Sequence, residues 1–349
     1  LLVGLQARQH VLLLGPPGTA KSELARAVCS RVAGAQWFYW LLGRTSTPEE
    51  LFGPVSLRAL EQDSYRRVTA GKLPEAHVAF LDEVFKANAA VLNLLLAVLN
   101  ERIFHNDGTP TAVPLITAVG ASNELPEDLE ELGALWDRFL LRYVVDYIRD
   151  PRHFERLLTL PPRQAGGTAI TLDELAAAQV EVQAVDVRAV VPTVVALRST
   201  VAGMGIRVSD RRWRQSLSLV QAHAWLEGRT QATADDLEIL TAALWDSPEQ
   251  IPQIRQAVMA AVNPLDQEAL ELLDQATEIH ARAMAAPEEK ATEVGMEANT
   301  KLKRINERLA TLRSQARETG RSTARIDEVA QRVATMQREV LARCLGITI

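Results

Sequence analysis

The sequence has little cysteine, since Cys29 and Cys344 are its only two thiols. Two cysteines that lie so far apart in the chain do not provide a disulfide framework, and they are too few for a cysteine zinc site. Long apolar runs are also missing, because no segment approaches the roughly 18 residues that a membrane-spanning helix needs. We therefore expect a cytoplasmic protein without a transmembrane segment.

Basic residues are not in excess either. The chain carries 38 Lys and Arg against 44 Asp and Glu, a formal net charge of −6. Binding to nucleic acid requires clustered cations that neutralise phosphates, so no nucleic-acid partner is expected. The balance is uneven, because eleven cations and only five acids lie from residue 301 onward. This stretch is either a solvated helical face or a docking surface for an acidic partner.

The length of 349 residues and the hydrophobic content of 47% are ordinary for a globular chain of two or more domains. In residues 1–150, short apolar strands alternate with helical stretches, which predicts an α/β core with a parallel sheet. The expected strands are 11–14, 37–42, 78–81, 115–120 and 143–146. A capping box formed by Thr47 and Glu50, with Pro48 at the first helical position, predicts that a helix starts there. In residues 151–263 the strand pattern disappears, and the capping residues Thr171, Ser209 and Thr233 predict a separate all-helical domain.

The clearest periodicity in the chain lies in residues 264–349. Apolar or alanine residues recur there at alternating spacings of three and four, which is typical of the seams of coiled coils. Pro287 and Gly320 divide the stretch, so three antiparallel helices are the simplest prediction. An intermolecular coiled coil is the alternative.

A phosphate-binding loop is the strongest single motif. It follows the apolar run 11–14 and leads into a helical stretch. Its residues are Gly15, Pro16, Pro17, Gly18, Thr19, Ala20, Lys21 and Ser22, with Glu23 next. Backbone N–H groups of such a loop cradle phosphates, Lys21 would reach the β- and γ-phosphates, and Ser22 would bind Mg²⁺. Ala20 stands where the usual pattern has a second glycine, and a chance turn before a helix is the alternative.

Two further predicted strands end in polar side chains that suit nucleotide chemistry. The run 78–81 leads into Asp82, which would hold Mg²⁺, and Glu83, which would polarise the attacking water. The next strand leads into Asn123, which would orient the water or contact the γ-phosphate. A turn or a helix cap is the alternative role of Asn123.

Eight segments in order read GPPGTAKS, STPEELFGP, GKLPEA, FLDEVFKAN, LNER, ASNELPE, LWDRFLLR and VSDRRW. Together they resemble the MoxR family of AAA+ ATPases and, within it, the RavA-like branch, over residues 10–250. The resemblance implies an ATP-binding core, a small helical lid and a hexameric ring with its sites between subunits. It also implies Mg²⁺-dependent hydrolysis of ATP to ADP and phosphate, a chaperone-like role in remodelling or complex assembly, and a partner with a von Willebrand factor A (VWA) domain. In this family the residue before the P-loop lysine is often alanine.

The resemblance also assigns roles to single residues. Asn123 would be sensor 1, and Arg138 would be the arginine finger that reaches the ATP of a neighbouring subunit. Arg142, one helical turn on, is a second candidate for the finger. Arg211 would be the sensor 2 residue of the lid, with Arg212 as the alternative register. An ion pair with an acid of the same helix is the alternative role of either finger candidate.

Two insertions into the core are also predicted. Residues 51–73 match a family insertion, and the turn at 106–108 predicts a β-hairpin over 103–114. Both would face the pore of the ring or a partner, or be surface loops.

The sequence also leaves two rival functions open. One is an AAA+ motor that acts on DNA, or one of the chelatase type, because such a motor would share every nucleotide motif. The other rival is a non-hydrolysing scaffold clamped by nucleotide, against which Glu83 and Arg138 argue.

Overall fold

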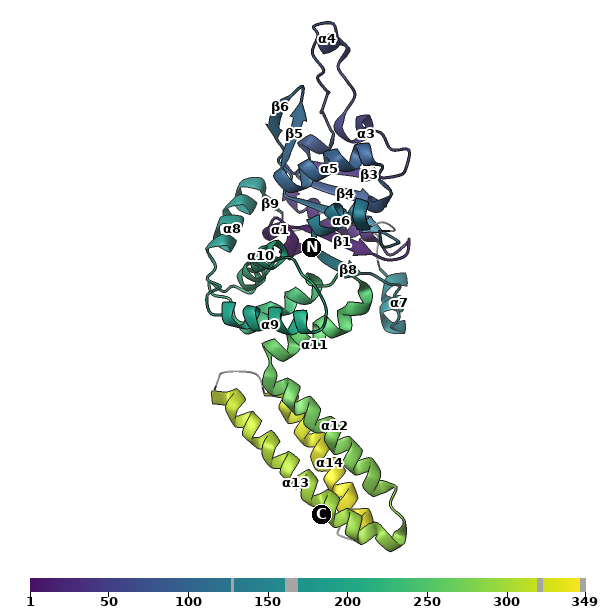
Figure 1. The fold of residues 1–349 in the computed structure, drawn as a ribbon, viewed down its shortest axis with the longest axis vertical. Helices are drawn as coiled ribbons and strands as arrows, with labels where there is room; N and C mark the ends of the chain where they lie inside the picture. Colours follow the sequence, from purple (N-terminus) through teal and green to yellow (C-terminus); the bar gives the residue numbers. More distant parts are fainter. Residues whose placement is uncertain (127–128, 161–168, 319–322, 346–349) are drawn as a thin grey trace. The chain divides into compact units, whose positions relative to one another are not determined.

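The computed structural model describes residues 1–126, 129–160, 169–318 and 323–345 (Figure 1). The chain forms two compact units, Leu1–Ile254 and Arg255–Ile349. The first unit holds a parallel sheet with its helices and then the lid, and the second is helical. None of the helices in the described ranges combines the length and the apolar character that a membrane crossing requires.

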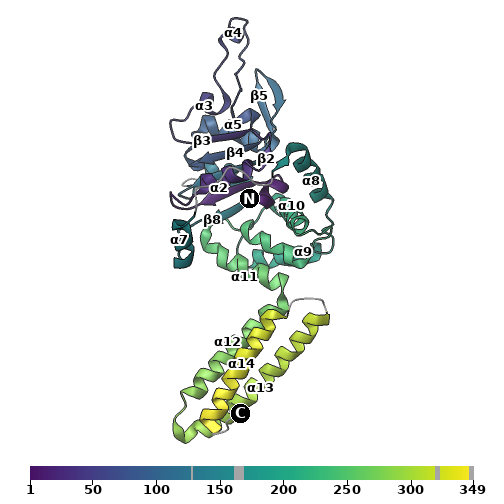
Figure 2. The ribbon, with the colours of Figure 1, turned by 180° about the vertical axis from the view of Figure 1, so that it is seen from behind.

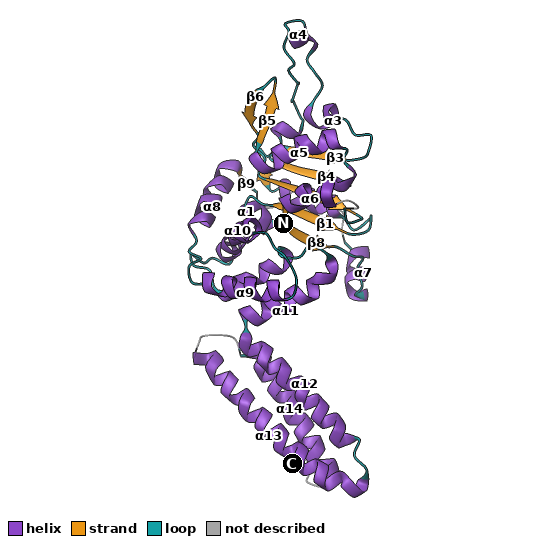
Figure 3. Cartoon of the chain, viewed as in Figure 1, coloured by secondary structure: helices purple, strands orange, loops and turns teal. Residues whose placement is uncertain are grey.

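Five parallel strands form the central sheet in the order β3-β4-β7-β1-β8 (Figure 3). They are β1 (His10–Leu14), β3 (Trp37–Leu41), β4 (Val78–Asp82), β7 (Thr117–Ser122) and β8 (Phe139–Val144). The predicted parallel sheet is confirmed, and β1 is buried along its whole length, as expected of a strand covered on both faces. The prediction for the last strand, 143–146, is wrong. The strand starts earlier because Phe139, Leu140 and Leu141 are buried within the sheet.

Helices cover both faces of this sheet. Figure 1 shows α5 and α6 on one face, and Figure 2 shows α2 on the other. The helices of the core are α1 (Leu2–Gln6), α2 (Lys21–Cys29), α3 (Pro48–Phe52), α4 (Leu57–Leu60), α5 (Ala89–Glu101), α6 (Leu129–Arg138) and α7 (Pro151–Leu158), with the 3-10 turns η1 (Leu73–Glu75) and η2 (Val84–Lys86). The predicted capping box at Thr47 and Glu50 starts α3, with Pro48 at its first position.

The two predicted insertions contact each other. The hairpin is confirmed as β5 (Ile103–Asn106) paired with β6 (Thr109–Ala112). In its turn, Asp107 accepts hydrogen bonds from the Ser64 hydroxyl and, at 2.9 Å, from the backbone N–H of Tyr65. These two residues lie in the other insertion, which extends from the core with α4 at its tip (Figure 1).

The lid consists mainly of helices that begin at residues predicted as caps. Its elements are α8 (Leu172–Ala184), α9 (Val191–Gly203), α10 (Asp210–Leu226), η3 (Ala234–Ala242) and η4 (Pro248–Gln250), followed by α11 (Ile251–Val262). Thr171, Ser209 and Thr233 cap α8, α10 and η3. The prediction of an all-helical domain needs one correction, because the short strand β9 (Ile170–Thr171) pairs with β2 (Val32–Ala33) of the core.

The second unit contains the three predicted helices, α12 (Pro264–Met284), α13 (Glu288–Glu318) and α14 (Ala324–Leu345). The apolar seams form one buried cluster within the chain, so no intermolecular coiled coil is needed to cover them. A polar contact sets the register of α13 against α14, because Gln337 bonds to both Asn299 and Asn306 at 2.8 Å. The turn predicted at Gly320 lies outside the described residues.

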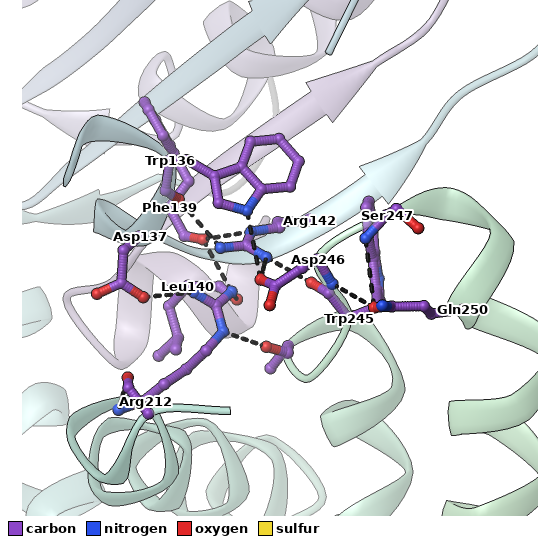
Figure 4. A network of polar contacts seen from close by, with 12 residues as sticks. Trp136, Asp137, Phe139, Leu140, Arg142, Arg212, Trp245, Asp246, Ser247 and Gln250 are labelled. Atoms are coloured by element: carbon purple, nitrogen blue, oxygen red, sulfur yellow. Dashed lines mark hydrogen bonds and ion pairs between the residues drawn. The ribbon is translucent and has the colours of Figure 1, made fainter. Parts of the chain in front are cut away.

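Arg142, on β8, joins the sheet to the lid (Figure 4). Its guanidinium donates to the carbonyl of Trp245 and, at 2.9 Å, to Asp246 Oδ1. It also donates to the carbonyls of Phe139 and Trp136, and it lies 4.1 Å from the centroid of the Trp136 ring. Only 1% of Arg142 is exposed, so these contacts replace the water that a buried cation loses.

A second buried arginine, Arg212 on α10, makes a similar joint from the side of the lid (Figure 4). It donates to the carbonyls of Phe139 and Leu140 at 3.1 and 2.8 Å, and to the carbonyl of Ala243. Its carboxylate partner is Asp137, at 3.3 Å. The two arginines therefore hold the lid to the amino end of β8.

Replacing Arg142 with Met keeps most of the side-chain volume but leaves the carbonyl of Trp245 and the carboxylate of Asp246 without this donor. An unsatisfied buried acceptor costs about 1–3 kcal/mol. We expect R142M to lower the free energy of unfolding of the first unit by at least that amount. Urea denaturation followed by tryptophan fluorescence measures the loss, because Trp136 packs on the guanidinium.

The matched control is R198M, which removes an ion pair between Arg198 and Asp210, two side chains that are 59% and 84% exposed. Its effect should stay below about 0.5 kcal/mol, since exposed pairs contribute little. Equal losses in the two variants would contradict the role that we assign to the buried joint.

Candidate nucleotide-binding site

The predicted phosphate-binding loop connects the carboxyl end of β1 to α2. The N–H of Gly15 donates to the carbonyl of Ser122 at 3.0 Å, which ties the start of the loop to β7. A Cβ atom on Gly15 would lie 1.8 Å from the carbonyl oxygen of Val145, so only glycine fits here. Because α2 begins at Lys21, its amino end and its positive dipole close the loop.

Lys21 is held by the loop that it belongs to. Its ammonium donates to the carbonyls of Gly15 and Pro16 at 2.7 and 2.8 Å. Burial lowers the pKa of Lys21, while the carboxylates of Asp82 and Glu83 act in the opposite direction. The acids of the next motif therefore lie within electrostatic reach of this ammonium.

Ala20 adopts the backbone conformation that the missing glycine would adopt. Its φ and ψ are 58° and 27°, in the left-handed region, directly before the first residue of α2. This conformation costs an L-residue about 1–2 kcal/mol. The departure from the usual motif thus changes the residue but keeps the shape of the loop.

We expect A20G to bind nucleotide about as well as the wild type. Glycine relieves about 1–2 kcal/mol of strain and brings only roughly 0.4–1 kcal/mol of extra unfolded-state entropy, so stability should rise slightly. A20V should weaken nucleotide binding, because a β-branched residue tolerates this conformation poorly. Titration with a fluorescent ATP analogue and thermal unfolding measure both effects. Tight binding by A20V would contradict this description of the loop.

Asp82 and Glu83 lie at the carboxyl end of β4. Burial raises the pKa of Asp82, and the backbone N–H of Glu83 opposes this shift by donating to it at 3.1 Å. In the described part of the chain, no group of three His, Cys, Asp or Glu side chains could hold a metal ion by itself. Mg²⁺ bound with nucleotide needs only one or two protein oxygens besides phosphates and water, so the hydroxyl of Ser22 and the carboxylate of Asp82 fit this ion.

The carboxylate of Glu83 is held from two directions. The amide of Asn123 donates to Glu83 Oε1 at 2.7 Å, and the ammonium of Lys86 lies 3.2 Å from Glu83 Oε2. Asn123 reaches Glu83 because β4 and β7 are neighbours in the sheet. The structure thus makes Asn123 a hydrogen-bond partner of Glu83, and its role in water positioning stays a prediction.

Two further hydrogen bonds reach carbonyls of the loop, one from within the loop and one from Tyr147. The hydroxyl of Thr19 donates to the carbonyl of Pro16 at 3.0 Å. Gly18 has a φ of 80°, and Glu23 is exposed in the first turn of α2. The hydroxyl of Tyr147 donates to the carbonyl of Pro17 at 3.3 Å.

Arg138 and Arg211 lie at the edge of the sheet where the strands begin, opposite the edge that carries the phosphate-binding loop. Arg138 precedes Phe139, which pairs with His10 at the start of β1, whereas the loop follows the end of that strand. Since a strand rises about 3.3 Å per residue, β1 separates the two edges by its full length. Arg211 is tied to the same edge by its ion pair with Asp137, the residue before Arg138. Neither arginine therefore reaches the loop of its own chain.

Two of the three guanidinium nitrogens of Arg138 are without acceptors among the described residues. Its Nε and Nη1 atoms are buried and, among the residues that the structure describes, have no hydrogen-bond partner. Burial lowers the pKa of Arg138, and the neighbouring Arg211 lowers it further. This is an unusual position for a cation, because donors that are buried without acceptors are costly.

The assignment of Arg142 as a second arginine finger is wrong. Helix α6 ends at Arg138, so Arg142 does not lie one helical turn further but in β8, where its guanidinium is buried in the joint to the lid. Arg212, the alternative for sensor 2, is also buried there. The sequence prediction missed Lys86 and Asp137, although both lie inside the quoted motifs.

Two family models match successive parts of the chain. The family model for the MoxR domain of MoxR-vWA-beta-propeller ternary systems matches residues 1–185, more than half of the chain. A model of an AAA lid domain matches residues 189–258.

Similar proteins cover much of the same region. An uncharacterised protein of Methanocaldococcus jannaschii is 40% identical over 271 residues, which are 77% of this chain and 71% of that protein. Protein MoxR of Paracoccus denitrificans is 29% identical over 155 residues, 42% of this chain and 44% of its own. A crystallised protein of Cytophaga hutchinsonii, to which ATPase activity is attributed, has the same fold. Its TM-score is 0.59 at 16% identity, over 75% of this chain and 86% of that one.

Proposed function

Because the chain belongs to the MoxR family of AAA+ ATPases, we propose that it hydrolyses ATP to ADP and phosphate with the help of Mg²⁺. The observation that carries this proposal is the position of Glu83. It lies beside Asp82 on the same edge of the sheet as the phosphate-binding loop, and its carboxylate contacts Asn123. A carboxylate in this position can orient a water molecule and accept its proton.

The other residues at the carboxyl ends of the strands have separate roles in hydrolysis. The loop N–H groups and the Lys21 ammonium bind the β- and γ-phosphates, whose oxygens replace the carbonyls that Lys21 now contacts. The hydroxyl of Ser22 and the carboxylate of Asp82 would hold the Mg²⁺ ion, which would neutralise charge on the phosphates when bound. Asn123 keeps the Glu83 carboxylate aimed at the water.

The position of the arginines supports a ring. Arg138 and Arg211 lie across the sheet from the loop of their own chain, so they act on the nucleotide of a neighbouring copy. A contact that joins one edge of each copy to the other edge of the next is heterologous, and it closes into a ring when the rotation fits. We propose a hexamer, as the family resemblance implies.

The finer assignments rest on the family. The matched family model is named for systems in which a MoxR protein works with a vWA protein, which supports a VWA-domain partner. We propose a chaperone-like remodelling or assembly role in the cytoplasm, and membership of the RavA-like branch on the basis of the eight sequence segments.

Phosphate release by purified protein tests the proposed reaction. We expect K21A to lose nucleotide binding and E83Q to bind ATP but to hydrolyse it about 10²–10⁴-fold more slowly, the usual contribution of a general base. Near wild-type hydrolysis by E83Q would contradict the mechanism. A wild type without turnover at any protein concentration would favour a nucleotide-clamped scaffold instead, and salt-sensitive retention of DNA on a filter would favour a DNA motor.

A second test asks whether Arg138 acts on a neighbouring subunit. R138A should bind ATP normally but lose about 10³–10⁵-fold in turnover, as other trans-acting arginines do. Mixing R138A with E83Q should restore activity, because one interface then joins an intact Glu83 to an intact Arg138. If each variant alone is inactive and no mixture recovers, Arg138 does not act in trans.

A further inference from the structure

A lysine lies beside the carboxylate that we assign as the general base, and the local backbone brings it there. Glu83 precedes the turn η2 with φ and ψ of 51° and 45°, a left-handed conformation that is uncommon for a residue with a side chain. The N–H of Lys86 donates to the carbonyl of Glu83 at 2.8 Å and closes the 3-10 turn. Side chains three residues apart in such a turn lie on the same side, so Lys86 faces Glu83.

The two carboxylate oxygens of Glu83 have different surroundings. Oε1 accepts a hydrogen bond from the amide of Asn123 at 2.7 Å. Oε2 is buried and receives no hydrogen bond from the residues that the structure describes, although the Lys86 ammonium lies 3.2 Å from it. Lys86 therefore holds Oε2 by its charge and not by a directed hydrogen bond.

This difference between the two oxygens matters for hydrolysis. A general base must lie within hydrogen-bond distance of the proton that it abstracts. Because Asn123 already occupies Oε1, Oε2 is the oxygen that would accept the proton of the attacking water. In the structure this oxygen is shielded from solvent and paired with a cation. The contact with Lys86 must therefore be released before Oε2 can take that proton.

Lys86 has room to leave its position beside Glu83. The lysine side chain is 49% exposed, whereas that of Glu83 is only 15% exposed. Lys86 also lines a cavity of about 460 Å³, together with residues that include Phe85, Asn88 and Leu125. The lysine is thus the mobile partner of the pair, and the carboxylate is the enclosed one.

We infer that Lys86 is a positioning residue, which holds Glu83 in a resting orientation and restrains hydrolysis until their contact is released. The inference rests on the proposed function, because it takes Glu83 as the general base. A lysine that restrains the base slows the reaction, so its removal should speed turnover. A lysine that aligns the base would have the opposite effect, and the sign of the change therefore distinguishes the two roles.

The variant K86M tests the inference, because it removes the charge and keeps most of the side-chain length. We expect kcat for ATP to rise about two- to fivefold, the range that the strength of a partly exposed ion pair allows, and KM to stay unchanged. K86R retains the charge and should lie closer to the wild type than K86M does. Phosphate release at a series of ATP concentrations measures both constants. An unchanged or lower kcat in K86M would overturn the inference.

The matched control is K301M. Lys301 is 48% exposed, almost as much as Lys86, and it forms an ion pair with Glu297 four residues before it. This pair lies on α13 of the second unit, so its loss should change neither kcat nor KM. An equal rise of kcat in K301M would show that the effect of K86M comes from the loss of any surface lysine.

A double-mutant cycle shows whether Lys86 acts through Glu83. The measured quantity is the affinity for ADP with Mg²⁺ and fluoroaluminate, a mimic of the transition state. K86M should bind this mimic about two- to fivefold more tightly than the wild type does, and a non-hydrolysable ATP analogue equally well. In the E83Q background, K86M should have no effect on either affinity, because the neutral glutamine has no charge for Lys86 to hold. Equal effects of K86M in the two backgrounds would contradict the inference.

The two measurements separate this inference from the proposed function. If the wild type hydrolyses ATP and K86M does so no faster, only the inference is wrong. If the wild type binds the mimic but does not hydrolyse ATP, the proposed function fails, and the cycle of affinities still decides whether Lys86 restrains Glu83. A wild type that binds ATP but not the mimic would contradict both.

Discussion

The buried guanidinium groups of Arg142 and Arg212 determine where the lid lies, and much of the functional geometry depends on that position. Both groups bond to the amino end of β8 and to the stretch around Ala243–Asp246, so core and lid share one set of carbonyl acceptors. The joint also fixes the position of Arg211, because this residue is the neighbour of Arg212 on α10. Asp137 forms ion pairs with both Arg211 and Arg212.

The direction of the parallel strands sets the second constraint. Every carboxyl end points to one edge, so the loop after β1, the acids after β4 and Asn123 after β7 meet there without any special folding. Residues that precede a strand must lie at the opposite edge, and Arg138 precedes β8. A single chain with this topology can therefore bind nucleotide at one edge while it presents an arginine at the other.

The features that the sequence predicts best are those that a few neighbouring residues determine. The loop, the caps at Thr47 and Thr171 and the turn of the hairpin each depend on a few adjacent residues. The last strand was misplaced because Arg142 interrupts its apolar pattern, and a buried arginine looks in a sequence like an exposed one. The contact of Asn123 with Glu83 needs the strand order, which no local pattern contains. Burial of the charge on Arg142 likewise depends on residues about a hundred positions later.

Two donors of Arg138 lack a partner among the described residues, at the edge of the sheet where these constraints meet. Most buried donors in proteins have a partner, and leaving one without an acceptor costs about 1–3 kcal/mol. Arg138 keeps two such donors at the edge where every guanidinium nitrogen of Arg142 and Arg212 has an acceptor, so a lack of nearby carbonyls does not explain the difference. Both nitrogens are buried within their own chain, so an acceptor from outside reaches them only after the side chain moves. The missing bonds therefore make Arg138 a poor contributor to the stability of one chain, and they favour any movement of the side chain that brings the two donors to an acceptor.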